Sequence, residues 1–280
     1  MREGEAIRDF KYPDRIIVGS NNKKIFKKMK FLYEPLVKKG AKFFSTSRKG
    51  AELIKYASNA FLATKITFIN EIANLCEVTG VNIEDISVGI GSDLRIGSRF
   101  LRAGPAYGGS CFPKDTKGLV SIADKFKTDL SIVKSVIKSN NNRKVLLTKR
   151  IKKIMNNKIK NKKIAVLGVT FKANTDDMRE SSSLIFIPYL LKMGGIVKYY
   201  DPSGPKNEFK KNKNLKFENT LTKVCLGADL IIINTEWDEF KSIDFKKIVK
   251  KNNFKIYDMR NLYNPGELKK KNIKYYSVGR

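Results

Sequence analysis

The chain has 280 residues and a mass of 31.9 kDa, with 41% hydrophobic and 10% aromatic residues, which is enough for two domains with their own cores. This composition excludes a disordered or collagen-like chain. The longest apolar stretches, such as 182–191 and 229–235, are shorter than the roughly 20 residues that span a bilayer. The first residues do not begin a signal peptide, so we expect a soluble cytoplasmic protein without membrane contact.

The chain is strongly basic. It has 57 Lys and Arg residues against 27 Asp and Glu residues, a formal net charge of +30, which suggests an acidic partner such as nucleic acid or a phosphorylated ligand. Most of the excess lies in short lysine runs, such as 269–271, rather than in arginines interleaved with aromatic residues. We therefore expect a solvated lysine-rich surface, with a nucleic-acid site as the alternative.

Cysteine and histidine usage excludes several kinds of site. Cys76, Cys111 and Cys225 are an odd number at unrelated spacings, so neither a disulfide framework nor a zinc site is predicted. The chain has no histidine and therefore no Ser-His-Asp triad and no imidazole metal ligand. Acid–base chemistry must come from Asp, Glu, Lys, Tyr or Cys.

The first elements are a short strand over 15–20, which ends in glycine, and a helical pattern over 22–39. Two elements do not make a domain. We therefore interpret residues 1–46 as the remnant of a larger domain.

Residues 47–156 are predicted to form a helical block. Apolar residues recur at intervals of three and four from Arg48 to Thr79, where Gly80 ends the pattern. Further helices are expected at 83–90, 113–126 and 130–154, with a glycine-rich segment at 89–109. A helix as long as the first commonly packs against a second copy, so we expect a homodimer through this block.

The polar run 156–162 is the best linker candidate, and the pattern changes after it. Strands expected at 163–169, 196–200, 229–235 and 254–258 alternate with helices at 182–193, 221–226 and 244–250. This alternation predicts a parallel α/β sheet over residues 157–280. Ligands of such sheets bind at the carboxyl ends of the strands, here 168–172, 201–202, 235–237 and 258–260.

The sharpest local signal is the segment 107–115, with the sequence YGGSCFPKD. Gly108 and Gly109 allow a ligand to approach the backbone, and Pro113 suits the first position of a helix. Cys111 would then lie at a helix N-terminus, where the helix dipole and Lys114 favour the thiolate. This setting suits a nucleophile, although a small buried cysteine behind a glycine turn is the alternative.

The long helix carries a second candidate. Lys55 and Asn59 are four residues apart and share a face, where they could donate to an oxyanion, although a helical lysine is usually only solvated. Cys76 and Cys225 lie on apolar helical faces, so we expect packed thiols at both positions.

These motifs carry a resemblance to a known family. In chain order they are KYASNAFLATK at 55–65, LRIG at 94–97, YGGSCFPKD at 107–115, GVTFK at 168–172, DMRES at 177–181 and YYSVGR at 275–280. Several motifs in register over the whole chain resemble the UDP-glucose 6-dehydrogenases of the UDP-glucose/GDP-mannose dehydrogenase family.

The resemblance implies an NAD-dependent, two-step oxidation of the primary alcohol of UDP-glucose to a carboxylate. In this family a cysteine matching Cys111 traps the aldehyde as a thiohemiacetal, which is oxidised to a thioester. Lys55 and Asn59 match groups that stabilise the oxyanion. Asp115 matches a group that positions or deprotonates the hydrolytic water, and Glu3 matches an acidic residue that assists it.

The resemblance also implies ligand contacts. The matching positions around UDP-glucose are Phe100, Arg102, Tyr107, Gly108, Phe171, Lys172 and Arg260, and Arg95 matches an arginine offered across the dimer interface. Lys114 and Arg179 match positions near the NAD cofactor. Arginine and lysine suit a diphosphate.

One feature departs from the family. No strand followed by GxGxxG and a helix occurs, because Gly89 and Gly91 lack a third glycine. The expected fold is thus α/β, a helical central block followed by a Rossmann-like nucleotide-sugar domain, in a truncated, split or decayed copy. The resemblance implies that residues 1–46 are the remnant of the family's N-terminal NAD-binding domain, and a separate N-terminal NAD-binding polypeptide is one expected partner.

The function expected is that of the C-terminal part of a UDP-glucose 6-dehydrogenase. The alternatives are a dehydrogenase of GDP-mannose or UDP-N-acetylmannosamine, or a non-catalytic protein that binds nucleotide sugars or nucleic acid.

Overall fold

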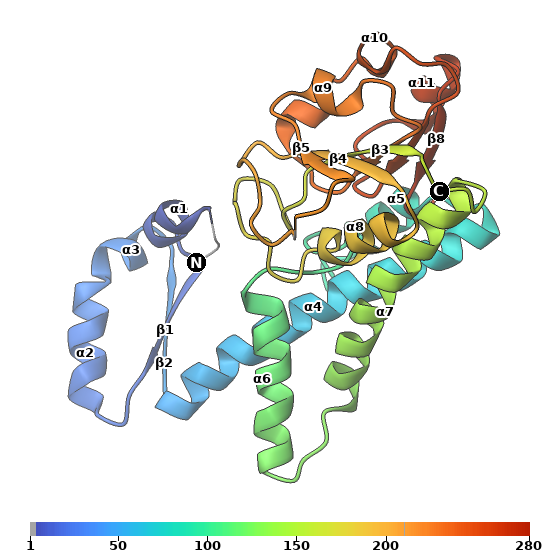
Figure 1. Ribbon diagram of the computed structural model, residues 1–280. Helices are drawn as coiled ribbons and strands as arrows, with labels where there is room; N and C mark the ends of the chain where they lie inside the picture. The colour runs from blue at the N-terminus through green and yellow to red at the C-terminus, as the bar shows by residue number, and fades with distance from the viewer. Residues whose placement is uncertain (1–3, 210) are drawn as a thin grey trace.

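The computed structural model describes residues 4–209 and 211–280. Figure 1 shows a small N-terminal unit beside a group of long helices, with a C-terminal sheet against the other end of those helices. No helix in the described ranges has the length and apolar character needed to cross a membrane.

The N-terminal unit is built on two parallel strands. Its elements are α1 (Ala6–Lys11), β1 (Arg15–Gly19), α2 (Lys23–Leu32), α3 (Glu34–Lys38) and β2 (Lys42–Thr46). β1 and β2 pair in register from Arg15 with Lys42 to Gly19 with Thr46. The single helix expected over 22–39 is two helices, because Pro35 cannot donate a backbone hydrogen bond to continue α2. No residue of the three helices is buried.

Four helices follow, as the apolar periodicity predicts. They are α4 (Arg48–Thr79), α5 (Ile83–Gly91), α6 (Cys111–Lys125) and α7 (Ser131–Ile154). The Ser47 side chain accepts from the Gly50 backbone N–H at the start of α4, and Gly80 ends the helix with a φ of 76°. α4 packs against both α6 and α7.

A six-stranded parallel sheet follows the helices. Its strands are β3 (Lys163–Leu167), β4 (Ile196–Tyr200), β5 (Leu215–Phe217), β6 (Leu230–Ile233), β7 (Lys255–Asp258) and β8 (Lys274–Ser277), in the spatial order β5-β4-β3-β6-β7-β8. The chain proceeds from β3 to one edge and then from β6 to the other. The order therefore reverses between β3 and β6, where open α/β sheets bind their ligands. The α/β fold class with a Rossmann-like parallel sheet is confirmed.

The two faces of the sheet bury alternating residues of the same strands. Ile164 and Val166 of β3 join a core with α4, α7 and α8 (Ser183–Lys192), whereas Ala165 and Leu167 face the opposite core. Helices α9 (Leu221–Cys225), α10 (Phe245–Val249) and α11 (Pro265–Lys270) cover that second face, with the 3₁₀ turn η1 (Asp238–Phe240) nearby. Because the first core contains side chains from α4 and α7, the long helices and the sheet are packed together (Figure 1).

Some features of the C-terminal part differ from the strands and helices that the sequence predicts. The short elements β5, α11 and β8 were not predicted. The expected linker 156–162 forms turns that pack on the fold, since Ile159 is buried in the first core.

Candidate functional site

Cys111 lies at the start of α6. It is the first residue of the helix, and Pro113 is the third, so α6 begins two residues earlier than the expected start at Pro113. Cys111 is exposed, and its Sγ lies 3.6 Å from Ser110 Oγ, whereas Cys76 and Cys225 are buried. The expectation of two packed thiols is therefore confirmed, and the alternative of a buried Cys111 is wrong.

Asp115, one helical turn after Cys111, joins the candidate catalytic residues of α4 and α6. Its carboxylate is wholly buried and accepts from Asn59 Nδ2 at 2.6 Å. Lys55 Nζ lies 3.4 Å from the same oxygen, and Lys114 pairs with the other oxygen. Lys55 and Asn59, which the sequence places on one face of a helix, therefore both contact Asp115, 56 residues after Asn59.

Charge explains the protonation state of this cluster. Burial raises the pKa of Asp115, but hydrogen bonds from Lys114 and Asn59 and the charge of Lys55 outweigh it, so the pKa lies below its ordinary value. The hydrogen bond to Asp115 also raises the pKa of Lys114. The arrangement therefore keeps the Asp115 carboxylate and the Lys114 ammonium charged at neutral pH in the first turns of α6, the helix that Cys111 begins.

Aromatic side chains lie beside this cluster. The Phe112 ring contacts Tyr107 and Phe100 edge to face, with ring centres 6.1 and 6.2 Å apart. Tyr107 is buried, and its burial raises the pKa of its hydroxyl, so it stays neutral. These rings therefore pack around Phe112, the residue after Cys111.

The two glycines before Cys111 allow close packing against Phe171. A Cβ on Gly109, which has a φ of 79°, would lie 2.6 Å from the Phe171 ring, and one on Gly108 would lie 3.0 Å from Phe171 Cβ. The Gly109 N–H donates to Arg179 O at 2.7 Å. The glycine turn therefore joins the segment before α6 to the loop that follows β3.

Buried polar side chains hold the segment 104–107 in place. Asn140 of α7 accepts from the Tyr107 N–H at 2.9 Å and donates to the Tyr107 carbonyl at 3.1 Å. Arg143 Nε donates to Gly104 O at 2.7 Å, and Asn70 of α4 accepts from the Gly104 N–H at 2.8 Å. Burial lowers the pKa of Arg143 to about 10, which still leaves it charged at neutral pH.

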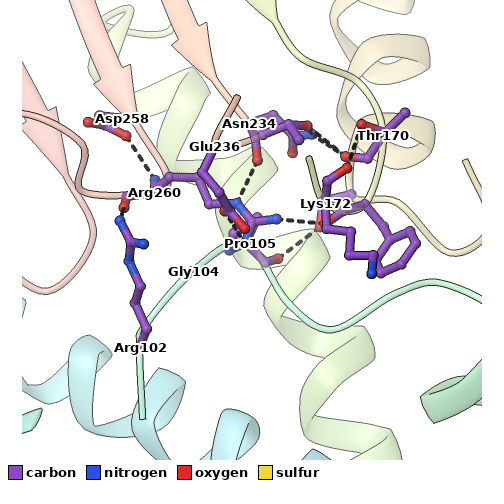
Figure 2. A network of polar contacts seen from close by, with 12 residues as sticks. Arg102, Gly104, Pro105, Thr170, Lys172, Asn234, Glu236, Asp258 and Arg260 are labelled. Atoms are coloured by element: carbon purple, nitrogen blue, oxygen red, sulfur yellow. Dashed lines mark hydrogen bonds and ion pairs between the residues drawn. The ribbon is translucent and has the colours of Figure 1, made fainter. Parts of the chain in front are cut away.

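Arg260 spans the carboxyl ends of three strands, as Figure 2 shows. It follows β7, its Nε donates to Asn234 O after β6 at 2.8 Å, and its second amino group donates to Phe171 O after β3 at 2.7 Å. Glu236 pairs with the remaining amino group at 2.7 Å. Burial lowers the pKa of Arg260, and the charge of Glu236 opposes that effect.

Lys172 and Arg102 lie near the hollow at these strand ends that Phe171, Asn234 and Arg260 line, which we call the strand-end crevice. Lys172 Nζ lies 5.6 Å from the centre of the Phe171 ring, and Arg102 donates to Arg260 O at 2.9 Å. Lys172 follows β3 and Arg260 follows β7, and these strands are not adjacent, because β6 lies between them. Both belong to one network all the same, since the Arg260 side chain reaches across β6 (Figure 2).

The other candidates lie differently. Arg95 is largely exposed and pairs with Asp93 on its own loop. Arg179 makes a two-pronged pair with Asp177. Glu3 lies outside the described residues.

Several residues of the site were missed by sequence reasoning. They share a polar side chain in a helix, after a strand or in the turn before α8, and they are Asn70, Asn140, Arg143, Lys144, Glu180, Asn234 and Glu236. Lys144, for example, is buried on α7 and donates to Glu180 at 2.7 Å. The sequence signal for these residues was the presence of polar side chains on the apolar face of α7. A polar side chain is buried at such a position only when it has a hydrogen-bond or ion-pair partner.

Two family models match the chain. The central domain of the UDP-glucose/GDP-mannose dehydrogenase family matches residues 49–142, and the UDP binding domain of the same family matches residues 165–265.

Individual proteins are similar over the whole chain. A UDP-glucose 6-dehydrogenase of Rickettsia felis is 46% identical over 282 residues, which cover 100% of this chain and 63% of the relative. Among solved structures, a UDP-glucose dehydrogenase of Pyrobaculum islandicum has a TM-score of 0.84 at 28% identity, covering 100% of this chain and 61% of that chain. A UDP-D-ManNAc dehydrogenase of Pyrococcus horikoshii has a TM-score of 0.82 at 28% identity, covering 100% and 63%. The chain thus spans less than two thirds of the length of these proteins.

Proposed function

The chain belongs to the UDP-glucose/GDP-mannose dehydrogenase family, and from this premise we propose that it is the part of a UDP-glucose 6-dehydrogenase that binds the nucleotide sugar and forms a covalent bond to it. One observation carries the proposal. Exposed Cys111 begins a helix whose next turn holds Asp115 together with Lys55 and Asn59. This is the set of groups that thiol addition to an aldehyde requires.

In the capture step, the Cys111 thiolate adds to the aldehyde carbon of the oxidised sugar. The carbonyl π electrons move to oxygen, and the resulting oxyanion takes a proton or a hydrogen bond. Lys55 and Asn59 are proposed as its donors, which is supported by their contacts with Asp115, one helical turn after Cys111. Asp115 thereby acts first as an anchor for these donors.

In the hydrolytic step, water adds to a thioester on Cys111, the carbon–sulfur bond breaks, and the thiolate leaves with the bonding electrons. The lowered pKa of Asp115 makes it a weak proton acceptor, so its charge suits orientation of the water better than deprotonation. The carboxylate product then leaves a free thiolate.

The oxidation between these states needs NAD, and the described residues do not fit that cofactor. In the N-terminal unit, the turn after β1 packs closely against the start of α4, since a Cβ on Gly19 would lie 2.8 Å from Ala51 Cβ and 2.9 Å from Arg48 Cα. In the large sheet, the turn after β3 gives its Val169 N–H to Asp201 rather than to a ligand. Lys114 and Arg179 remain proposed contacts to a cofactor held by another polypeptide or segment.

The diphosphate of UDP-glucose is proposed to bind in the strand-end crevice. Arg260 and Lys172 supply positive charge at the point where the strand order reverses. Phe100, Tyr107 and Phe171, with Gly108, supply the apolar wall between that point and Cys111. Arg102 supports the network through the Arg260 carbonyl.

A homodimer through the central helices is proposed from the exposed face of α4. Large apolar residues recur there every seven or eight positions at Leu53, Phe61, Phe68 and Leu75, each at least half exposed. Such a stripe on one face suits a second helix. Leu94 and Arg95 are both largely exposed on the loop after α5, and we propose that this loop contacts the second copy and places Arg95 at its site.

The nature of the sugar has one alternative. The solved UDP-D-ManNAc dehydrogenase of Pyrococcus horikoshii is as similar as the UDP-glucose dehydrogenase, at 28% identity each. The FPKD motif and the Lys55 to Asn59 pair favour UDP-glucose.

Thermal unfolding tests the proposed function. UDP-glucose should raise the melting temperature at both 50 and about 200 mM salt, whereas binding through diffuse lysine charge falls steeply over that range. An oligonucleotide that stabilises the protein more than UDP-glucose does would contradict the proposal. The aldehyde UDP-hexodialdose should in addition protect Cys111 from iodoacetamide.

A further inference from the structure

Asn234 is a buried polar residue of the strand-end crevice with an unpaired acceptor atom. It follows β6, and its side chain is 1% exposed. Among the described residues, none donates a hydrogen bond to its Oδ1. A buried acceptor without a partner is uncommon and indicates a missing donor.

The orientation of the carboxamide is defined by its neighbours. Nδ2 faces the Thr170 carbonyl at 3.4 Å and Thr235 Oγ1 at 3.2 Å. The Thr235 hydroxyl donates its hydrogen to Thr170 O at 2.7 Å, so its Oγ1 is able to accept a hydrogen bond from Asn234 Nδ2. The reversed orientation would set Oδ1 against the Thr170 carbonyl, and it is therefore excluded.

The unpaired atom belongs to a residue that lines a small hollow. The other walls of the hollow are Pro105, Ala106, Gly108, Phe171 and Arg260, among others. These include residues of both segments that the proposed substrate site joins. Of the buried side chains with an unpaired polar atom in the described part, Asn234 is the one that lines this hollow.

The position of Asn234 relative to Arg260 points to the chemistry of the donor. The Arg260 guanidinium is held 2.8 Å from the Asn234 carbonyl, so the carboxamide and the cation are parts of one rigid unit (Figure 2). A diphosphate at Arg260 has a sugar on each side, the ribose and the hexose. Both sugars carry hydroxyl donors within a few bonds of the phosphorus atoms.

We propose that Asn234 Oδ1 accepts a hydrogen bond from a sugar hydroxyl of the bound nucleotide sugar and so helps to select sugar-bearing diphosphates over other anions. This inference rests on the proposed function and adds a residue to its site. The carboxamide would be a binding residue, with no part in bond making or breaking.

A comparison of ligands tests it by isothermal titration. Asn234→Ala should weaken UDP-glucose binding by about tenfold, the scale of one hydrogen bond. If the donor is a ribose hydroxyl, Asn234→Ala also weakens UDP binding about tenfold. The deoxy-UDP that lacks this hydroxyl, at the 2′ or the 3′ position, then binds the unaltered protein and the variant equally. If the donor is on the hexose, UDP binds both proteins equally and only UDP-glucose is affected. Asn252→Ala, at an exposed turn, is the control and should change nothing.

Two results would overturn the inference. One is an equal loss for all four ligands, which would mean that the carboxamide only supports the fold, and the other is no loss for any ligand. Melting temperatures of the Asn234→Ala and Asn252→Ala proteins accompany the titrations. Failure of the unaltered protein to bind UDP or UDP-glucose is a separate result, which would contradict the proposed function itself.

Discussion

Asn59 on α4 donates its amide hydrogen to the buried carboxylate of Asp115 on α6 at 2.6 Å. This contact joins two helices that start 63 residues apart and fixes the side of α4 that faces Cys111. The same carboxylate forms ion pairs with Lys55 and Lys114, so one buried negative charge binds two positive charges and an amide. Loss of that charge should therefore affect both the stability and the chemistry of the site.

The first prediction concerns Asp115→Asn. The folded pKa of Asp115 lies below its ordinary value of 3.8, so its charged form stabilises the fold at neutral pH, and this contribution is lost as the pH falls through the folded pKa. The variant should lose about 1–3 kcal/mol of unfolding free energy at pH 7, because Lys55 and Lys114 lose their partner. The difference from the unaltered protein should shrink below pH 4. Urea unfolding at pH 7 and pH 3 measures both effects.

Asp129→Asn is the matched control, since Asp129 also pairs with a lysine but lies on the surface. It should change the unfolding free energy little. Equal losses in the two variants at pH 7 would contradict the central role of Asp115.

The long helices could be predicted from sequence because local signals agree with the tertiary fold. For α4 the expected bounds 48–79 are those observed, since a regular apolar pattern lies between the Ser47 cap and Gly80. β5 was missed because it has three residues with an exposed lysine at its centre. Strands of this length take their conformation from pairing with β4, which no local pattern records.

The site was predictable to a similar degree. The glycines and Pro113 of 107–115 indicate a turn followed by a helix, which is how Cys111 lies. The contact of Asn59 with Asp115 spans 56 residues, and those of Arg260 with the ends of β3 and β6 span 89 and 26 residues. The family resemblance supplied the candidates, and only the fold shows which of them touch.

Thiol reactivity provides the second prediction. Iodoacetamide under native conditions should label Cys111 before the other cysteines, because Cys111 is exposed at a helix N-terminus whereas Cys76 and Cys225 are buried. Burial also raises the pKa of Cys225 to about 12, which leaves almost no thiolate there at pH 7. Mass mapping at several time points measures the order. Denatured protein, the control, should label at all three positions, and earlier native labelling of Cys76 would count against the site.

The third prediction is that Lys172→Ala weakens UDP binding by about 1.5–3 kcal/mol, the scale of a hydrogen bond to a charged group. Lys172 is the better test than Arg260, because Arg260 also holds the carbonyls of Asn234 and Phe171 and its loss would disturb the fold. Isothermal titration measures the change. Lys269→Ala, on α11 away from the crevice, should be without effect, and equal losses at both lysines would mean that diffuse charge binds the nucleotide.

The fourth prediction addresses the apolar stripe of α4. Phe68→Glu should convert a dimer to a monomer, because it places a charge in the middle of the face that a second copy would cover. Light scattering coupled to gel filtration gives the mass. Phe126→Glu makes the same change at an exposed position after α6 and should leave the dimer intact. A monomeric unaltered protein, or a dimeric Phe68→Glu variant, would refute this interface.

The last prediction is that the 280-residue polypeptide, supplied with UDP-glucose and NAD, forms no NADH. Hydride transfer needs a glycine-rich turn at a helix N-terminus to hold the pyrophosphate, whereas the turn after β1 packs against α4 at Gly19 and the turn after β3 gives its Val169 N–H to Asp201. Absorbance at about 340 nm follows the reaction, with the full-length Rickettsia felis relative as the positive control. The same preparation should still bind UDP-glucose, since the strand-end crevice around Arg260 needs no part of the dinucleotide site. Steady NADH formation by this polypeptide alone would mean that a cofactor site exists among residues that we assign to other roles.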